Sequence, residues 1–164
     1  MAAMKNALRS AVLALFLLPV AVSAGARTAE AAEAMQFASE QLVVHANGGA
    51  RTFTVELALS EQQREYGLMF RKSMPADHGM LFDFGTTRRV LMWMKNTPLP
   101  LDMLFLDRTG AIVSISANAV PYSEAIIDSQ AAIRYVIELN GGIAAKFGLS
   151  VGDKVTSATI AKGR

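Results

Sequence analysis

The chain has 164 residues, of which 52% are hydrophobic, and it carries a formal net charge of +2 and no cysteine. This length suits one domain with a core large enough to need no covalent crosslink. The missing cysteines exclude disulfides, thiolate metal sites and a cysteine nucleophile.

Residues 1–26 have the pattern of a secretory signal peptide. Lys5 and Arg9 precede an uncharged, largely apolar run over 11–22, and small residues permit cleavage after Ala24 or Ala26. The run is shorter than the roughly 20 residues that a helix needs to cross a bilayer. We therefore predict an exported protein, periplasmic or secreted, that keeps no stable membrane anchor after cleavage.

Cleavage changes the charge of the protein. It removes Lys5 and Arg9 and leaves 14 basic against 14 acidic residues. Binding to nucleic acid depends mainly on neutralising phosphates with basic side chains. We therefore expect no nucleic-acid partner.

The remaining chain divides into a short lead-in and one domain. Residues 27–39 are rich in alanine and glutamate, which predicts a flexible lead-in, and 40–162 form a single globular domain. A hairpin is predicted from strands 41–46 and 51–59 around the Asn-Gly-Gly turn at 47–49. Ser60 and Gln63 then have the spacing of a capping box, which predicts a short helix that ends at Gly67.

Short strands dominate the rest of the domain. We predict them at 80–84, 90–96, 101–106, 111–116, 132–139 and 155–160, with turns at 85–87 and 107–110 and a second short helix at 143–147. About eight short strands and two short helices indicate a mainly β (α+β) fold. The expected architecture is a compact antiparallel β barrel or sandwich.

A candidate ligand site lies around the loop that follows 90–96. Pro98 and Pro100 stiffen this loop, and polar side chains stand beside the only tryptophan of the chain. An arginine there could hold a carboxylate in a forked geometry. The alternative is a buried structural network in which Asp102 pairs with Arg71 or Lys95. The candidate ligand-binding residues are Arg71, Trp93, Lys95, Asn96 and Asp102.

Three other hypotheses about the function stay open. Thioethers bind Cu(I), so a periplasmic copper site could use His78, Met80, Met92 and Met94, although methionine also fills gaps in cores. A carboxylate-dependent hydrolase could use Glu56, Asp102 or Glu138. A structural partner in the cell envelope would need a large exposed apolar patch.

Several blocks of the sequence resemble one known family. Residues 67–71 (GLMFR), 79–82 (GMLF), 93–97 (WMKNT), 100–103 (PLDM) and 107–110 (DRTG) resemble signature blocks of the domain of unknown function 192 family. Residues 138–142 (ELNGG) and 152–153 (GD) resemble its closing blocks. The resemblance covers about 40–162 and implies a compact, mostly β domain with short helices, often exported, with no established activity. Pro98 departs from the family pattern.

The resemblance also marks the candidate ligand-binding residues. Arg71, Trp93, Lys95, Asn96 and Asp102 match signature positions of the family, which implies no documented role for any of them. Our leading hypothesis is a monomeric, non-catalytic protein that binds a small polar or anionic ligand, for example a saccharide. We expect no cofactor.

Overall fold

The computed structural model describes residues 35–163 as a β-rich domain. The predicted signal peptide and most of the predicted lead-in lie outside these residues. None of the described helices reaches the length and hydropathy of a membrane span. The elements are β1 (Ser39–Ala46), β2 (Gly49–Ala58), α1 (Glu61–Tyr66), β3 (His78–Met92), β4 (Leu101–Leu106), β5 (Ile112–Ala119), β6 (Ile127–Asn140), α2 (Ile143–Phe147), β7 (Lys154–Ser157) and α3 (Ala158–Lys162).

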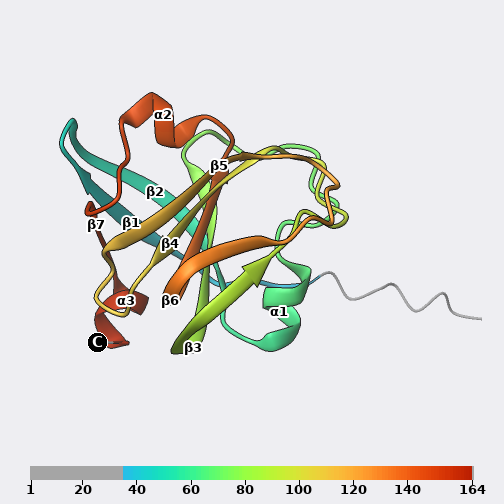
Figure 1. Ribbon diagram of the computed structural model, residues 1–164, viewed down its shortest axis with the longest axis horizontal. Helices are drawn as coiled ribbons and strands as arrows, with labels where there is room; N and C mark the ends of the chain where they lie inside the picture. Colours follow the sequence, from blue (N-terminus) through green and yellow to red (C-terminus); the bar gives the residue numbers. More distant parts are fainter. Residues whose placement is uncertain (1–34, 164) are drawn as a thin grey trace, which may run out of the picture. The chain divides into compact units, whose positions relative to one another are not determined.

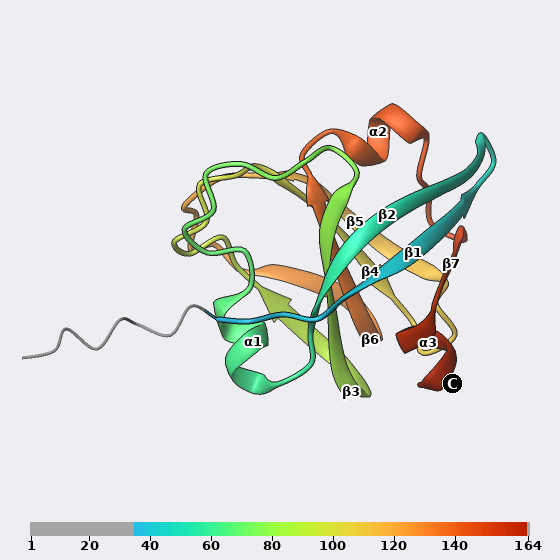
Figure 2. The same ribbon diagram turned by 180° about the vertical axis from the view of Figure 1, so that it is seen from behind.

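All seven described strands belong to one sheet, in the order β5-β4-β6-β3-β2-β1-β7. Neighbours are antiparallel except β2 and β3, which run parallel. The sheet curls into a half-barrel, as Figures 1 and 2 show from opposite sides. A short bridge between Ala111 and Lys154 links its two edges, and the Val155 amide donates to the Gly110 carbonyl at 2.7 Å. The mainly β fold class predicted from the sequence is confirmed.

Several predicted boundaries differ from the structure. The strand predicted at 90–96 is the end of β3 and stops at Met92, and the one predicted at 132–139 already begins at Ile127. The expected turn at 85–87 is part of β3, because Gly85 (φ +73°) lets the strand bend and continue to Met92. The strand predicted at 155–160 ends at Ser157, whose side chain accepts from the Ile160 amide and caps α3. The structure therefore has seven strands and three helices in its described residues, instead of about eight and two.

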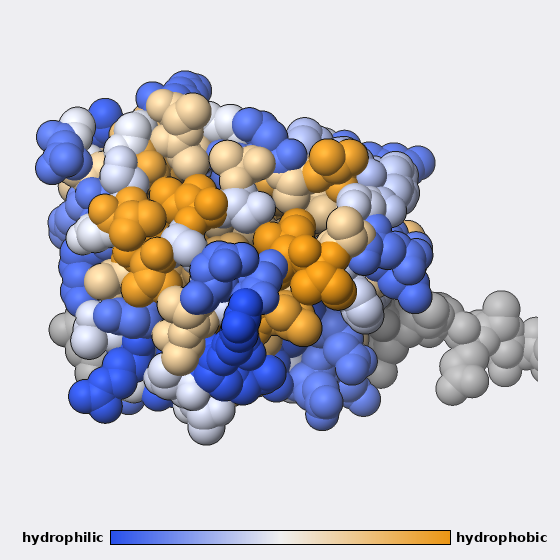
Figure 3. All heavy atoms as spheres, viewed as in Figure 1, coloured by the Kyte–Doolittle hydropathy of each residue, from blue (hydrophilic) through white to orange (hydrophobic). Residues whose placement is uncertain are grey.

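The sheet is buried on both of its faces along β4, the first part of β3 and the last part of β6. On β4, Leu104 and Leu106 point to one hydrophobic cluster, while Met103 and Phe105 point to a second cluster on the other face. β1 contributes Leu42 and Val44 to the first cluster, and β2 contributes Phe53, Val55 and Leu57. The second cluster is covered in part by the loop that contains Leu68 and by the segment that contains Met94. Figure 3 shows hydrophobic residues gathered at the surface over the end of β3 and the start of β6.

The predicted capping box of α1 is present. The Gln63 amide donates to Ser60 Oγ at 3.1 Å, and the Ser60 amide donates to the Gln63 side-chain oxygen at 3.0 Å. The helix ends at Gly67 (φ +48°), where a Cβ would lie 3.3 Å from the ring of Phe82. Arg64 ties the helix to β3 by donating to the Asp83 carbonyl at 3.0 Å. Together these contacts fix α1 beside the second cluster.

Candidate functional site

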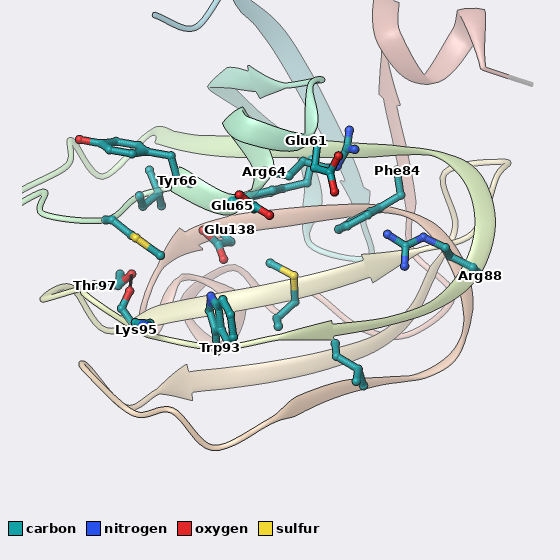
Figure 4. Close-up of a pocket in the computed structure, with 16 residues that line it drawn as sticks. Glu61, Arg64, Glu65, Tyr66, Phe84, Arg88, Trp93, Lys95, Thr97 and Glu138 are labelled. Atoms are coloured by element: carbon teal, nitrogen blue, oxygen red, sulfur yellow. Dashed lines mark hydrogen bonds between the residues drawn. The ribbon is translucent and has the colours of Figure 1, made fainter. Parts of the chain in front are cut away.

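A pocket of about 240 Å³ lies between α1, the second half of β3 and the segment 93–97. Ligand pockets generally begin at about 300 Å³, so this one suits a small molecule. Figure 4 shows its polar and aromatic side chains converging from these elements, with Glu138 of β6 among them. The side chains used below are Arg64, Phe84, Arg88, Trp93, Lys95, Thr97 and Glu138.

Glu138 is the least expected of these side chains. It lies on a central strand, where its direct neighbours across the sheet are Met80 on β3 and Met103 on β4. Only 4% of the residue is exposed, and its carboxyl makes no hydrogen bond or ion pair with any residue of the described chain. Burial raises the pKa of its carboxyl from 4.5 to about 8. At neutral pH the carboxyl is therefore mostly protonated and can both donate and accept a hydrogen bond.

Thr97, Trp93 and Lys95 form one wall of the pocket. Thr97 is buried, and its hydroxyl donates to the Lys95 carbonyl at 3.1 Å, so its oxygen can still accept a hydrogen bond. The Lys95 ammonium lies 5.8 Å from the centre of the Trp93 ring. Trp93 is 47% exposed, so part of its indole is available to a ligand. Sequence reasoning predicted Trp93 and Lys95 for a ligand site, and the structure places both at this pocket.

Two arginines flank the ring of Phe84 at the opposite side. The Arg64 guanidinium lies 5.6 Å from the ring centre and that of Arg88 5.1 Å. Arg64 also donates to the carbonyls of Leu59 (2.6 Å) and Asp83 (3.0 Å), which holds it in place. Within residues 35–163 neither arginine forms an ion pair. The lining includes the exposed carboxylates of Glu61 and Glu65 as well, so the pocket has mixed charge.

Arg71 lies outside this pocket. Its guanidinium binds the carboxylate of Glu56 through two hydrogen bonds of 2.6 Å each, and it lies 5.8 Å from the Phe37 ring centre. The hydrogen bond to Glu56 raises the pKa of Arg71, against the opposing effect of burial. The pair joins the loop after α1 to β2. Its partner is Glu56 instead of the Asp102 considered from the sequence.

Asp102 also lies outside the pocket, and its carboxylate caps the start of α2. It is fully buried, and its carboxylate accepts from the backbone amides of Asn118 (2.8 Å), Gly142 (3.1 Å) and Ala144 (2.7 Å). Two of these amides belong to the start of α2, which has no other side-chain cap. The carboxylate therefore replaces an ordinary N-cap residue.

Asn96 supports the loop through its backbone. It has φ +55°, and its carbonyl accepts from the Phe70 amide at 2.8 Å. Its side-chain nitrogen lies 3.8 Å from the sulfur of Met69. Asn96 is exposed and does not line the pocket described above.

The three methionines of the possible copper site belong to the second cluster or pack against it, while His78 lies at the start of β3. Met80 and Met94 are buried in the second cluster, and Met92 packs against it. His78 is half-exposed and is hydrogen-bonded to Asp77 at 2.8 Å. No group of three or more histidine, cysteine, aspartate or glutamate side chains in the described chain could hold a metal ion. Packing in the hydrophobic core is therefore a sufficient explanation for these methionines.

The pocket contains residues that sequence reasoning had not assigned to a ligand site. Arg64, Arg88 and Thr97 were not singled out, because they are separated in sequence and have no motif of their own. Glu138 was considered only as a hydrolase carboxylate. A signal was present in the strand predicted at 132–139, where Glu138 is an acid in a buried apolar run.

Comparisons with known proteins agree on the family and give no activity. The model of the domain of unknown function 192 family, described as "Uncharacterized ACR", matches residues 42–157. No curated protein matches the chain. A crystal structure described as a candidate transcription regulator from Sinorhizobium meliloti 1021 has 53% identity and a TM-score of 0.74, and the match covers 76% of this chain and 97% of the other. A protein of unknown function from Novosphingobium aromaticivorans DSM 12444 has 34% identity and a TM-score of 0.71, with coverage of 76% and 95%.

Proposed function

Because this chain belongs to the domain of unknown function 192 family, whose name specifies no activity, we propose a function from the pocket itself. The protein binds a small polar, saccharide-like ligand in the pocket at Glu138. One observation carries the proposal: a buried carboxyl in a central strand has no partner in the described chain and lines a pocket. Burying an unpartnered polar group costs free energy, and such groups are concentrated at functional sites.

The chemistry of the pocket supports a ligand with hydroxyl groups. The neutral Glu138 carboxyl can donate to one ligand oxygen and accept from another, and the Thr97 hydroxyl can accept from a third. The exposed face of Trp93 is suited to packing against the apolar face of a sugar ring. Arg88 and Lys95 favour a ligand that also carries a negative charge.

We place this binding outside the cytoplasm. Residues 1–26 have the signal-peptide pattern, and export would expose the pocket to small molecules of the periplasm or the medium. Fractionation of cells that express the tagged full-length chain tests this part of the proposal. Retention of uncleaved protein in the cytoplasm would contradict it.

Titration calorimetry against a panel of monosaccharides, sugar acids and polyols tests the binding. We expect at least one member to bind the wild type, and we expect Glu138→Ala and Thr97→Val to weaken that binding about tenfold or more, since each removes a buried hydrogen bond. Glu124→Gln is the matched control, because Glu124 is an exposed carboxylate outside the pocket. A panel that gives no binding, or binding that Glu138→Ala leaves unchanged, would refute the proposal.

A carboxylate-dependent hydrolase is the second candidate function. The raised pKa of Glu138 suits a general acid, and Glu65 lines the same pocket from α1. The other two carboxylates considered from the sequence are occupied, Glu56 by Arg71 and Asp102 by backbone amides. Proton NMR of the same panel, extended to disaccharides, would detect cleavage products. Unchanged substrates in the presence of bound protein favour simple binding.

A further inference from the structure

The carboxyl of Glu138 shares its pocket with a second carboxyl group, that of Glu65. Glu138 is buried on β6, while Glu65 is an exposed residue of α1. Figure 4 shows both side chains directed into the space between α1 and β6. Within residues 35–163 neither carboxyl group forms an ion pair or a hydrogen bond. Two acidic groups therefore line one part of the pocket, and no cation of the described chain is bound to either of them.

The cations that line the pocket leave Glu138 unpaired. The Arg64 guanidinium is held by two backbone carbonyls, at 2.6 and 3.0 Å. Figure 4 places Arg88 on the far side of Phe84 from Glu138. The Lys95 ammonium lies against an aromatic ring whose centre is 5.8 Å away. The mixed charges of the pocket are thus separated in space, and a cation beside Glu138 has to come from the ligand.

An ammonium group is the cation that suits two carboxyl groups from different elements. It has three donors, so it can bind one oxygen of Glu138 and one of Glu65 and keep a third donor for water. Hydrogen bonds between charged groups are about twice as strong as those between neutral ones. A hydroxyl group has a single donor and no charge, so it uses this part of the pocket less fully.

We propose that the saccharide ligand of the pocket is an amino sugar whose ammonium group is bound by the carboxyl groups of Glu138 and Glu65. This inference rests on the proposed saccharide-binding function and adds the charged group by which the ligand is selected. The sugar ring packs on the exposed part of Trp93. Arg88 and Lys95 remain available to a negative group on another part of the same ligand.

Binding of an ammonium group ionises Glu138. In the free protein the carboxyl holds a proton at neutral pH, because burial raises its pKa to about 8. In the complex the carboxylate pairs with the ammonium, which keeps its own protons, and the proton of the carboxyl leaves to the solvent. A neutral sugar leaves the carboxyl protonated. The two kinds of ligand therefore differ by one released proton.

The other charged and titratable groups at the pocket come from three elements. The neighbours of Glu138 across the sheet, Met80 and Met103, are uncharged. The groups that face it are Glu61, Arg64, Glu65 and Tyr66 of α1, Arg88 of β3 and Lys95 of the segment 93–97. They surround a charged and a neutral ligand alike, so substitution of Glu138 itself identifies the source of the proton.

Titration calorimetry at pH 6 compares glucosamine, galactosamine and mannosamine with the parent hexoses and with the N-acetylated forms. We expect one amino sugar to bind about tenfold or more tightly than its two neutral counterparts. Titrations in two buffers of different ionisation enthalpy should show the release of about one proton, and the affinity should rise about tenfold between pH 5.5 and 6.5. A neutral sugar gains no affinity over this interval.

Two substitutions test the two carboxyl groups. Glutamine keeps hydrogen-bonding capacity but carries no charge. We expect Glu138→Gln to abolish proton release and to lower the affinity for the amino sugar to that of its neutral counterparts. Glu65→Gln should weaken binding of the amino sugar about tenfold and leave the neutral counterparts unchanged. Glu124→Gln, outside the pocket, is the matched control. If Glu138→Gln does not fold, as judged by circular dichroism, Glu65→Gln carries the test.

Three outcomes contradict the inference. A neutral sugar or sugar acid that binds as tightly as every amino sugar would overturn it and leave the saccharide-binding function standing. Binding of an amino sugar without proton release, or with the same affinity in Glu138→Gln, would place the ammonium away from the buried carboxyl. Absence of binding by all the sugars would overturn the inference and the proposed function together. The failure of one is thus distinguishable from the failure of both.

Discussion

Replacing Glu138 by glutamine removes a titratable group from the core, and we expect this to change how stability depends on pH. In the unfolded chain the carboxyl has a pKa near 4.5, while burial in the folded protein raises it to about 8. Between these values the folded protein keeps a proton that the unfolded chain has released. The free energy of unfolding therefore falls as pH rises, by about 1.4 kcal/mol per pH unit and on the order of 5 kcal/mol over the whole window.

Urea denaturation of both proteins at pH 5, 6, 7 and 8 measures this effect. Wild type should lose stability relative to Glu138→Gln across the series, because glutamine is neutral at every pH. The two proteins share every other titratable group, so the contributions of those groups cancel in the difference. Glu124→Gln, which removes an exposed carboxylate, should follow the wild type. Parallel curves for wild type and Glu138→Gln would refute the assignment of a buried, protonated carboxyl.

Three other substitutions probe the framework of the site by denaturation. Gly79→Ala should lower the free energy of unfolding by about 1–3 kcal/mol, because the added Cβ would lie 2.5 Å from the Glu138 carbonyl oxygen. An unchanged denaturation midpoint would contradict this close approach. Asp102→Ala should cost about 3 kcal/mol or more by leaving three backbone amides without their acceptor, and Asp102→Asn should cost less. A double-mutant cycle of Arg71→Ala and Glu56→Ala should give only about 0.2–1 kcal/mol, since both side chains are partly exposed; a coupling that persists unchanged in 1 M salt would be inconsistent with this ion pair.

The local elements of the fold were predictable because their signals lie within a few residues. The Ser60 and Gln63 capping box and the hairpin at 47–49 are formed as predicted. The extent of β3 was not predictable in the same way. Gly85 and its neighbours have the composition of a turn, yet pairing of Arg88 to Met92 with β6 extends the strand beyond it. Long-range pairing therefore outweighed the local signal.

The candidate site was predictable only in part. Unusual polar residues near Trp93 drew attention to the correct loop, and Trp93 and Lys95 do line the pocket. The partners of the other polar residues depended on strand order. Glu56 meets Arg71, and Asp102 meets α2, through contacts that join segments 15 to 42 residues apart. No spacing rule in the sequence encodes these pairings.

The sequence alone determined the family, the mainly β class and the short capped helix, because these depend on composition, periodicity and local hydrogen bonds. The tertiary structure decided which ionisable side chains find a partner and which are left without one. The curled sheet buries both faces of the last part of β6, so a glutamate on the second face is buried between Met80 and Met103. A carboxyl there has a raised pKa for lack of water and partners, and that property exists only once the strands have assembled.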